Sequence, residues 1–482
     1  MRFDLIAGTF VECELDQSRP AVIGSDGVLS WEEFRRSVGR WVAEARGVGI
    51  VKDVPVVIYG HKETEFLVAI AGCLELGAPF VPVDEIYPEE RLQRIAAIVR
   101  APVIYRTAQA GFRKLAQAPE TMQEKDLAYV IFTSGSTGEP KGVQIGRESV
   151  VTLVDWMHAD FALGLKPVFM NQAPFSFDLS MYEVFSFLHE GGTLVLNSRQ
   201  AIAAPDVYYA RIKQHGVTAW ISTPSFAHQQ LLNKQFSRLH LPHLDTFLFC
   251  GEVLPANLCR RLRERFPGAR IINTYGPTEA TVATTWVFID DQILSAYDPL
   301  PVGRAKPGST VRIAGDGEIE ILGEHVMRGY LNSPQLNQEK LFREGGVRGF
   351  RTGDFGELGK DGLIFCRGRR DDQIKLNGYR IELLEVDKAL QQLPGVMRSA
   401  AVPLHKADGS VMRLLGYITS EGAGDPLTDG RLADWKEQLA KRIPHYMVPA
   451  ELRVMADLPV STNGKIDRKA LEKAYLESAR RG

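Results

Sequence analysis

The sequence predicts an α/β protein with a large amino-terminal body and a small α+β domain at the carboxy terminus. Three observations support this prediction. The chain has 482 residues, which suggests about three structural units. Strand-like and helix-like patterns alternate through its first part, as in largely parallel sheets. Near Asp371 the pattern becomes that of a smaller unit, so we expect domains at residues 1–370 and 371–482.

The first strand-helix-strand unit is predicted early in the body. Residues 54–59 form a short apolar run with Pro55 near its start, residues 64–76 have helical composition, and residues 78–83 are again strand-like. This order is typical of two parallel strands joined by a helix.

The same pattern recurs twice further along the chain. A helix over 207–215 is stopped by Gly216 before a strand at 217–221. A second helix over 255–266 has an apolar residue at every fourth position and precedes a strand at 270–273. The repetition indicates a largely parallel architecture.

The carboxy-terminal part of the sequence has a different texture. From about residue 290 the apolar pieces are short and glycines are frequent, which predicts a β-rich subdomain. After residue 371 a helix is predicted from the spacing of Leu383, Val386, Leu390 and Leu393. Pro394 and Gly395 end that helix.

The composition excludes several classes of protein. Hydrophobic residues make up 45% and charged residues 24%, which is typical of globular chains and not of disordered ones. Lysine plus arginine number 57 against 59 for aspartate plus glutamate, a net charge of -2. This balance gives no overall positive bias that would recruit a phosphate backbone, so we expect no nucleic acid partner.

The cysteines and the amino terminus indicate a cytoplasmic protein. The five cysteines are widely spaced without a C-x-x-C pair, which argues against a disulfide framework and a zinc site. Asp4 and Glu12 interrupt the apolar stretch that a secretory signal needs. The apolar run at 66–74 is about half of what a bilayer requires, so we expect no stable membrane association.

A glycine- and hydroxyl-rich loop is the strongest local signal in the sequence. It follows the apolar run 129–132 and reads TSGSTGEPKG over residues 133–142. Glycines let backbone N–H groups approach an anion, hydroxyls add donors and a lysine adds charge, so the loop suits phosphates. Pro140 stands where a Walker A loop needs a glycine, which excludes that motif. Alone, the loop could also be a polar turn.

The loop resembles the phosphate loop of the adenylate-forming superfamily, and further motifs follow in that superfamily's order. They read NTYGPTE at 273–279, RTGD at 351–354, GRRDDQIK at 368–375, GYRIE at 378–382 and NGK at 463–465. The resemblance covers nearly the whole chain. It implies a multi-subdomain adenylate-forming body joined by a hinge at Asp371 to a mobile α+β domain.

Three other segments resemble one group in this superfamily, the ligases that load D-alanine onto a small carrier protein. They read NQAPFSFDLS at 171–180, STPSF at 222–226 and FLFCGEVLP at 247–255. The resemblance implies that ATP converts D-alanine to D-alanyl-AMP, and that a carrier's phosphopantetheine thiol then takes the alanyl group. The chain ends 17 residues after Lys465, so we expect a separate carrier protein. A teichoic-acid-type polymer is that group's usual destination.

The resemblance also assigns roles in nucleotide binding. Lys465 would be the catalytic residue, bridging the α-phosphate and the substrate carboxylate. Asp354 would accept hydrogen bonds from the ribose hydroxyls, and Arg369 would support the ribose or phosphate. Glu279 would bind Mg²⁺, because hard cations prefer oxygen ligands. The remaining ATP-binding candidates are Thr133, Ser134, Gly135, Asn273, Thr274, Tyr275, Gly276, Pro277 and Thr278, with Tyr275 stacking on the base.

Three residues are the candidates for recognising the amino acid. Asp178 follows aromatic residues, and a buried carboxylate needs a cation such as the substrate ammonium. By resemblance, Cys250 and Val282 would line the side-chain pocket, and their modest size suits a small substrate.

Alternatives to this interpretation remain. The enzyme could activate L-alanine, glycine or serine for peptide biosynthesis, or a degenerate member could bind nucleotide without chemistry, although intact Lys465, Glu279 and Asp354 argue against the latter. Structural interpretations also exist for single residues. They are helix capping for Asp178 and Glu279, a solvated turn for Lys465, and core packing for Tyr275 and Cys250.

Overall fold

The computed structural model describes residues 1–12, 16–135, 139–164, 166–369, 373–406, 410–420, 429–460 and 466–481. The chain divides into two compact units. The first comprises Met1–Glu85, Ala96–Phe132 and Gly142–Arg370, and the second comprises Ile86–Ile95, Thr133–Lys141 and Asp371–Gly482. The predicted boundary at 370/371 and the hinge residue Asp371 lie outside the described residues, so both stay predictions.

The first unit contains a seven-stranded sheet in the order β20-β10-β9-β6-β5-β7-β8. Strand β5 (Val56–Gly60) lies parallel to β6 (Phe80–Asp84), and helix α2 (Thr64–Leu76) connects them, so the predicted strand-helix-strand unit is confirmed. Each strand begins two residues later than predicted, directly after Pro55 or Pro79, because proline has no N–H to donate. The other strands are β7 (Val103–Arg106), β8 (Gly111–Lys114), β9 (Leu127–Thr133), β10 (Lys141–Gly146) and β20 (Gly329–Tyr330).

A nine-stranded sheet follows, in the order β17-β16-β15-β14-β13-β11-β12-β3-β4. The predicted helices and strands of this region are confirmed as α7 (Pro205–Gln214), β13 (Ala219–Ser222), α9 (Ala256–Arg265) and β15 (Arg270–Tyr275). Six consecutive strands of the sheet, β15-β14-β13-β11-β12-β3, are parallel. The remaining strands are β3 (Pro20–Ile23), β4 (Val28–Ser30), β11 (Val168–Asn171), β12 (Thr193–Leu196), β14 (Thr246–Phe249), β16 (Thr285–Phe288) and β17 (Arg304–Ala305).

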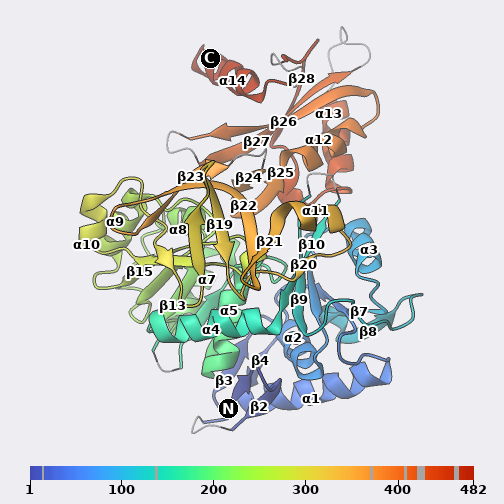
Figure 1. The fold of residues 1–482 in the computed structure, drawn as a ribbon, viewed down its shortest axis with the longest axis vertical. Helices are drawn as coiled ribbons and strands as arrows, with labels where there is room; N and C mark the ends of the chain where they lie inside the picture. The colour runs from blue at the N-terminus through green and yellow to red at the C-terminus, as the bar shows by residue number, and fades with distance from the viewer. Residues whose placement is uncertain are drawn as a thin grey trace. The chain divides into compact units, whose positions relative to one another are not determined.

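Helix α5 (Ser180–Glu190) is buried between the two sheets. Its residues 180–188 are all buried, and they include the polar Ser180, Glu183 and Ser186 beside the apolar side chains. Phe185 stacks on Tyr129 of the first sheet, and α5 also packs on β11 and β12 of the second. Helix α4 (Arg147–Asp160) lies beside it (Figure 1). The start of α5 is therefore a rigid platform for the preceding turn, which contains Asp178.

The predicted β-rich subdomain is confirmed as a five-stranded antiparallel sheet of the first unit. Its register pairs Asp354 on β22 (Val347–Leu358) with Arg369 on β23 (Ile364–Arg369). The other strands are β18 (Thr310–Ile313), β19 (Glu318–Leu322) and β21 (Leu341–Glu344).

The second unit has its own α+β core. Strands β26 (Val396–His405), β27 (Val411–Ser420) and β28 (Glu451–Val454) form one sheet, and β24 (Gln373–Leu376) pairs with β25 (Tyr379–Glu382). The predicted helix is α12 (Leu383–Gln391), which buries Leu383, Val386 and Leu390. Helices α13 (Asp429–Ala440) and α14 (Arg468–Arg481) complete it.

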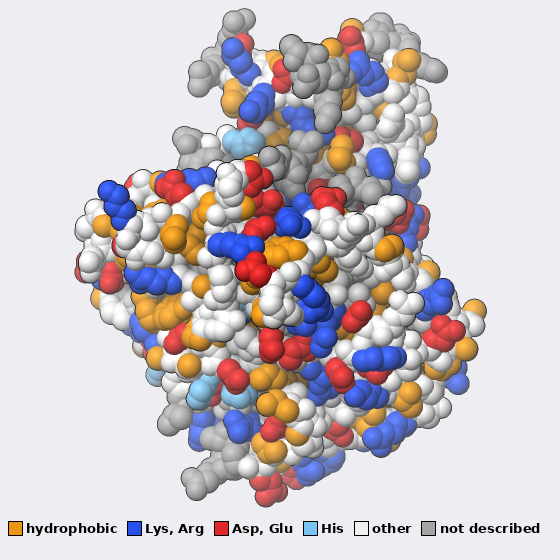
Figure 2. All heavy atoms as spheres, in the orientation of Figure 1, with side chains coloured by type: hydrophobic (Ala, Val, Ile, Leu, Met, Phe, Trp, Pro, Cys, Tyr) orange, Lys and Arg blue, Asp and Glu red, His pale blue; other side chains and the backbone are white. Residues whose placement is uncertain are grey.

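In the described parts of the chain, every helix is too short or too polar to span a bilayer. Acidic and basic side chains are interspersed on the face shown in Figure 2. The elements not yet named are β1 (Arg2–Asp4), β2 (Thr9–Val11), α1 (Trp31–Gly47), α3 (Glu89–Ile98), η1 (Thr107–Gln109), α6 (Arg199–Ala203), α8 (Pro224–Gln230), η2 (Thr278–Ala280), α10 (Asp291–Ala296), α11 (Pro334–Lys340) and η3 (His445–Met447).

Candidate active site

The loop between β15 and β16 carries several of the predicted site residues. It turns back tightly on itself, because the Thr284 N–H donates to the Tyr275 carbonyl oxygen at 2.8 Å. A Cβ atom on Gly276 would lie 2.4 Å from the Cα of Ala283, so only glycine fits there. The predicted site residues on this loop are Tyr275, Gly276, Pro277, Thr278, Glu279 and Val282.

Tyr275, Asp354 and Arg369 form a hydrogen-bonded cluster. The Tyr275 hydroxyl donates to Asp354 Oδ2 at 2.6 Å, and Arg369 Nη1 donates to Oδ1 at 2.7 Å. Loss of hydration raises the pKa of Tyr275 well above its usual value, and the charge of Asp354 adds to the effect. The phenol therefore stays protonated and remains a donor to the carboxylate. Strands β15, β22 and β23 bring together three residues that are far apart in the sequence.

Asn273 and Thr274 are buried on β15 and hold that strand in place. The Asn273 amide donates to the carbonyl oxygen of Pro301 at 2.8 Å. The Thr274 hydroxyl donates to the carbonyl oxygen of Phe249 at 2.9 Å and accepts from the Tyr182 hydroxyl at 3.1 Å. Both side chains make internal hydrogen bonds, and their predicted contact with ATP stays a prediction.

Glu279 is fully buried on the same loop. Its Oε1 accepts a hydrogen bond from the Tyr330 hydroxyl at 2.6 Å. Its carbonyl oxygen accepts from the N–H of Met327 at 2.8 Å. The segment 327–330 therefore fixes both the backbone and the carboxylate of Glu279.

Asp178 and Cys250 lie near Tyr182, and Val282 contacts Cys250. Asp178 lies in the turn before α5, and Tyr182 follows it by one helical turn. Burial raises the pKa of Tyr182 far above its usual value, and the charges of Cys250 and Asp178 raise it further, so both groups lie near the phenol. The Cys250 Sγ contacts the carbonyl oxygen of Val282 at 3.7 Å. The structure thus brings the three predicted amino-acid contacts together.

A buried lysine holds the turn that carries Asp178. Lys62 Nζ donates to Asn171 Oδ1 and to the carbonyl oxygen of Ala173, and lies 4.2 Å from the centre of the Phe175 ring. Asn171 in turn donates to Glu183 Oε2. Burial lowers the pKa of Lys62 to about 8, opposed by the charge of Glu183. This network links the β5–α2 connection to the turn.

Thr133, Ser134 and Gly135, which the sequence analysis predicts to bind phosphate, belong to the second unit. The Ser134 hydroxyl donates to the carbonyl oxygen of Arg380 at 2.9 Å, and the Gly135 N–H donates to Glu385 Oε2 at 3.2 Å. The buried Thr133 hydroxyl has no hydrogen-bond partner among the residues that the structure describes. Lys465, the predicted catalytic residue, lies outside those residues.

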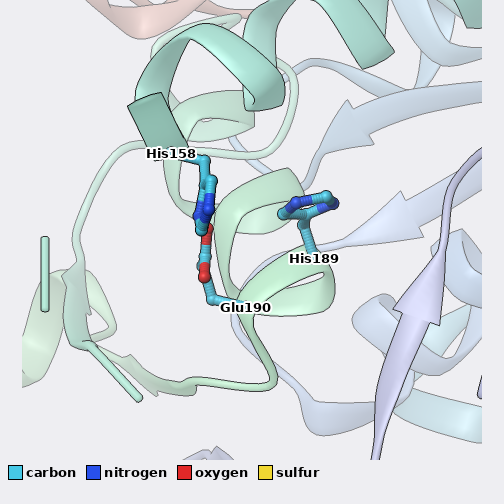
Figure 3. Close-up of side chains that lie close together, drawn as sticks. All are labelled: His158, His189 and Glu190. Carbon is cyan, nitrogen blue, oxygen red and sulfur yellow. The ribbon is translucent and has the colours of Figure 1, made fainter. Parts of the chain in front are cut away.

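His158, His189 and Glu190 form a separate cluster at the ends of α4 and α5 (Figure 3). The two histidines lie on different helices. His158 Nδ1 lies 2.7 Å from Glu190 Oε1, and its side chain is 65% exposed. Positions 189 and 190 are consecutive, so they point about 100° apart on the helix. We interpret the cluster as an exposed ion pair beside a second imidazole.

Besides Lys62, the sequence interpretation missed four residues that hold the predicted ones. Tyr182 could have been found, since it follows Asp178 by four positions on a helix. Tyr330, Lys306 and His325 gave no signal, because only the folded chain brings them to the β15–β16 loop.

Comparison with known proteins defines the class. The family model for AMP-binding enzymes matches residues 11–331. The adenylation domain AlmE of Vibrio cholerae, solved with glycyl-adenosine-5'-phosphate, superposes with a TM-score of 0.82 at 21% identity, covering 97% of this chain and 99% of that one. The o-succinylbenzoate CoA synthetase of Bacillus subtilis gives a TM-score of 0.79 at 20% identity, covering 95% and 96%. At these identities the two structures show the shared fold.

Curated relatives narrow the family. A D-alanine--D-alanyl carrier protein ligase of Bacillus licheniformis is 35% identical over 94% of this chain and 95% of its own length. A ligase of the same name from Bacillus cereus is 38% identical over 86% of this chain and 88% of its own. The chain therefore belongs to the AMP-binding enzymes and, within them, to the family of the D-alanine--D-alanyl carrier protein ligases.

Proposed function

We propose that this protein activates D-alanine with ATP and transfers it to the phosphopantetheine thiol of a separate carrier protein. The observation that carries the proposal is that Asp178 and Cys250 lie near Tyr182 and that Val282 contacts Cys250. A buried carboxylate suits an ammonium group, and two walls of modest size suit a small side chain. The names of the relatives support D-alanine as that substrate.

The nucleotide would bind at the Tyr275, Asp354 and Arg369 cluster. Each Asp354 oxygen already accepts one hydrogen bond, which fixes the carboxylate, and an ionised carboxylate has about four acceptor sites. It can therefore accept from both ribose hydroxyls as well. The buried Thr133 hydroxyl supports the assignment of Thr133, Ser134 and Gly135 to the phosphates, since a polar group without a partner is ready for a ligand.

Glu279 would supply a carboxylate to Mg²⁺. The residue fits this role because it offers hard oxygen ligands and because the Tyr330 hydroxyl fixes the orientation of the carboxylate. When bound, the cation would neutralise phosphate charge, which is the main obstacle to bringing a carboxylate up to a polyphosphate.

The reaction has two displacement steps. In the first, a carboxylate oxygen of D-alanine attacks the α-phosphorus of ATP, and the bond from that phosphorus to pyrophosphate breaks. In the second, the carrier's sulfur attacks the carbonyl carbon, the bond to AMP breaks, and the thiol loses its proton. Asp178 would hold the ammonium and Lys465 the carboxylate, so the reacting groups meet in a fixed orientation. The hinge at Asp371 would allow the small domain to serve both steps.

We place the reaction in the cytoplasm. ATP is the activating substrate, and the described cysteines Cys73, Cys250, Cys259 and Cys366 are present as thiols rather than disulfides, as is usual in a reducing compartment.

Pyrophosphate exchange with D-alanine, L-alanine, glycine and serine tests the proposal. We expect D-alanine to give the highest kcat/KM, and Lys465→Ala to abolish exchange while ATP affinity stays within about tenfold, because the lysine acts where charge develops. A higher kcat/KM for glycine, serine or L-alanine would overturn the substrate assignment. Loading of a phosphopantetheinylated carrier with labelled D-alanine tests the second step.

A further inference from the structure

The backbone at Val282 is strained. Thr281 and Val282 have φ angles of +53° and +69°, and both are β-branched residues, for which positive φ is strongly disfavoured. The Ala283 N–H donates to the carbonyl oxygen of Thr281 at 2.8 Å, which closes a three-residue γ-turn around Val282. Strain of this kind persists only where the surroundings enforce it.

His325 and Lys306, which lie outside the loop, form hydrogen bonds that hold the turn in this conformation. The Thr281 hydroxyl donates to the carbonyl oxygen of His325 at 2.6 Å, and the Thr284 hydroxyl lies 3.1 Å from His325 Nε2. Lys306 Nζ donates to the carbonyl oxygen of Ala283 at 2.8 Å. Hydrogen bonds therefore hold the residues on both sides of Val282.

Lys306 is an unusual residue to find in this position. Only 1% of its surface is exposed, and its ammonium group lies 5.0 Å from the centre of the Trp156 ring. Burial lowers its pKa to about 7. A methionine would fill a similar volume without the dehydration of a charge, so what the lysine adds is its hydrogen bond to the turn.

The turn that Lys306 and His325 hold is also part of the candidate amino-acid pocket. Val282 is one predicted wall, and its carbonyl oxygen is the contact of Cys250, the other wall. A shift of the turn would move both walls relative to Asp178. The two enantiomers of alanine, pinned at the carboxylate and the ammonium, differ only in where the methyl group points.

We propose that Lys306 is a positioning residue which, with His325, fixes the turn at Val282 and thereby sets the preference for D- over L-alanine. This inference rests on the proposed function. Lys306 touches no substrate in this scheme and acts only through the backbone of Ala283.

The test compares Lys306→Met with the wild type in pyrophosphate exchange. We expect the D-to-L ratio of kcat/KM to fall at least fivefold, with KM for D-alanine raised and KM for ATP within twofold of wild type. Arg147→Met is the matched control, since Arg147 is a partly buried cation that donates to the carbonyl oxygens of Leu5 and Leu74 instead. It should lose stability and keep the wild-type ratio.

A milder variant keeps the proposal falsifiable if Lys306→Met does not fold. Thr284→Val removes only the hydroxyl that meets His325 and should lower the D-to-L ratio in the same direction, by about twofold or more. A ratio unchanged in every folded variant at the turn would overturn the role of Lys306. Absence of D-alanine-dependent exchange in the wild type would instead overturn the proposed function.

Discussion

Lys62 and Lys306 support the two sides of the candidate amino-acid pocket in different ways. Lys62 lies in a network with Asn171 and Glu183, and it holds the turn that carries Asp178, the proposed contact of the substrate ammonium. Lys306 packs on Trp156 and holds the strained turn that carries Val282. Burial lowers the pKa of the first to about 8 and of the second to about 7.

The difference separates two kinds of selectivity. The Asp178 side would recognise a charge, which needs an anchored carboxylate in a network of polar groups. The Val282 side would recognise a shape, which needs a backbone held against its own preference. Each side should therefore fail in its own way when its support is removed.

The largest effect is expected from Asp178→Asn, which removes the charge and keeps the shape. Loss of a buried ion pair costs about 3–5 kcal/mol, so kcat/KM for D-alanine should fall by about two to three orders of magnitude. Propionate, which lacks the amine, should gain relative to alanine. Pyrophosphate exchange with both acids measures this, and an unchanged preference for alanine would remove Asp178 from the pocket.

Lys62→Met should disturb the Asp178 side of the candidate pocket, because Lys62 holds the turn that carries Asp178. It leaves buried groups on Asn171 and Ala173 without their donor, so the free energy of unfolding should fall by about 2–4 kcal/mol in urea denaturation. KM for D-alanine should rise and the D-to-L ratio should stay near wild type. A changed ratio would mean that the two sides are not independent.

The free energy of unfolding, measured against pH, should reveal the titration of Lys306. Because the pKa of Lys306 is about 7 when folded and near its ordinary 10.5 when unfolded, the unfolded chain binds more protons above pH 7. The wild type should therefore gain stability relative to Lys306→Met as pH rises from 7 to 9, by about 2 kcal/mol. His325, whose pKa burial lowers well below its usual value, stays neutral throughout this window.

Urea denaturation of both proteins at pH 7, 8 and 9 measures the effect. Lys62 titrates identically in the two proteins and cancels in the difference. A stability difference that is flat over this range would show that the folded protein keeps Lys306 charged.

The smallest effect is expected from Tyr275→Phe, which tests whether the nucleotide side is separate from both walls. It removes one hydrogen bond to Asp354, worth about 1 kcal/mol, so KM for ATP should rise about fivefold. The D-to-L ratio and KM for D-alanine should not change. Steady-state pyrophosphate exchange at varied ATP concentration measures these constants. A change in the D-to-L ratio of kcat/KM would show that Tyr275 and the turn at Val282 are coupled.

The sequence offered candidates for the residues that would face a ligand, but not for the residues that hold them. The motif at 273–279 and the segment around Asp178 could be read directly, as could the α/β class and the βαβ units. Lys306 could not be found in this way, because its sequence neighbours Pro307 and Gly308 read as an exposed turn. Its burial depends on packing against Trp156, which lies 150 positions away. The hinge and Lys465 remain predictions from the sequence.

The β15–β16 loop also bears on attempts to redesign the substrate range. Exchanging only Cys250 and Val282 for residues from another adenylating enzyme would graft new side chains onto a backbone still shaped by Thr281, Lys306 and His325. The same loop carries Glu279 and adjoins Tyr275, so a graft that relaxes the turn would also disturb the residues proposed to bind ATP and Mg²⁺. The smallest transplantable unit is therefore the loop together with positions 306 and 325, and a scan of pocket-lining residues alone would select neither of those two positions.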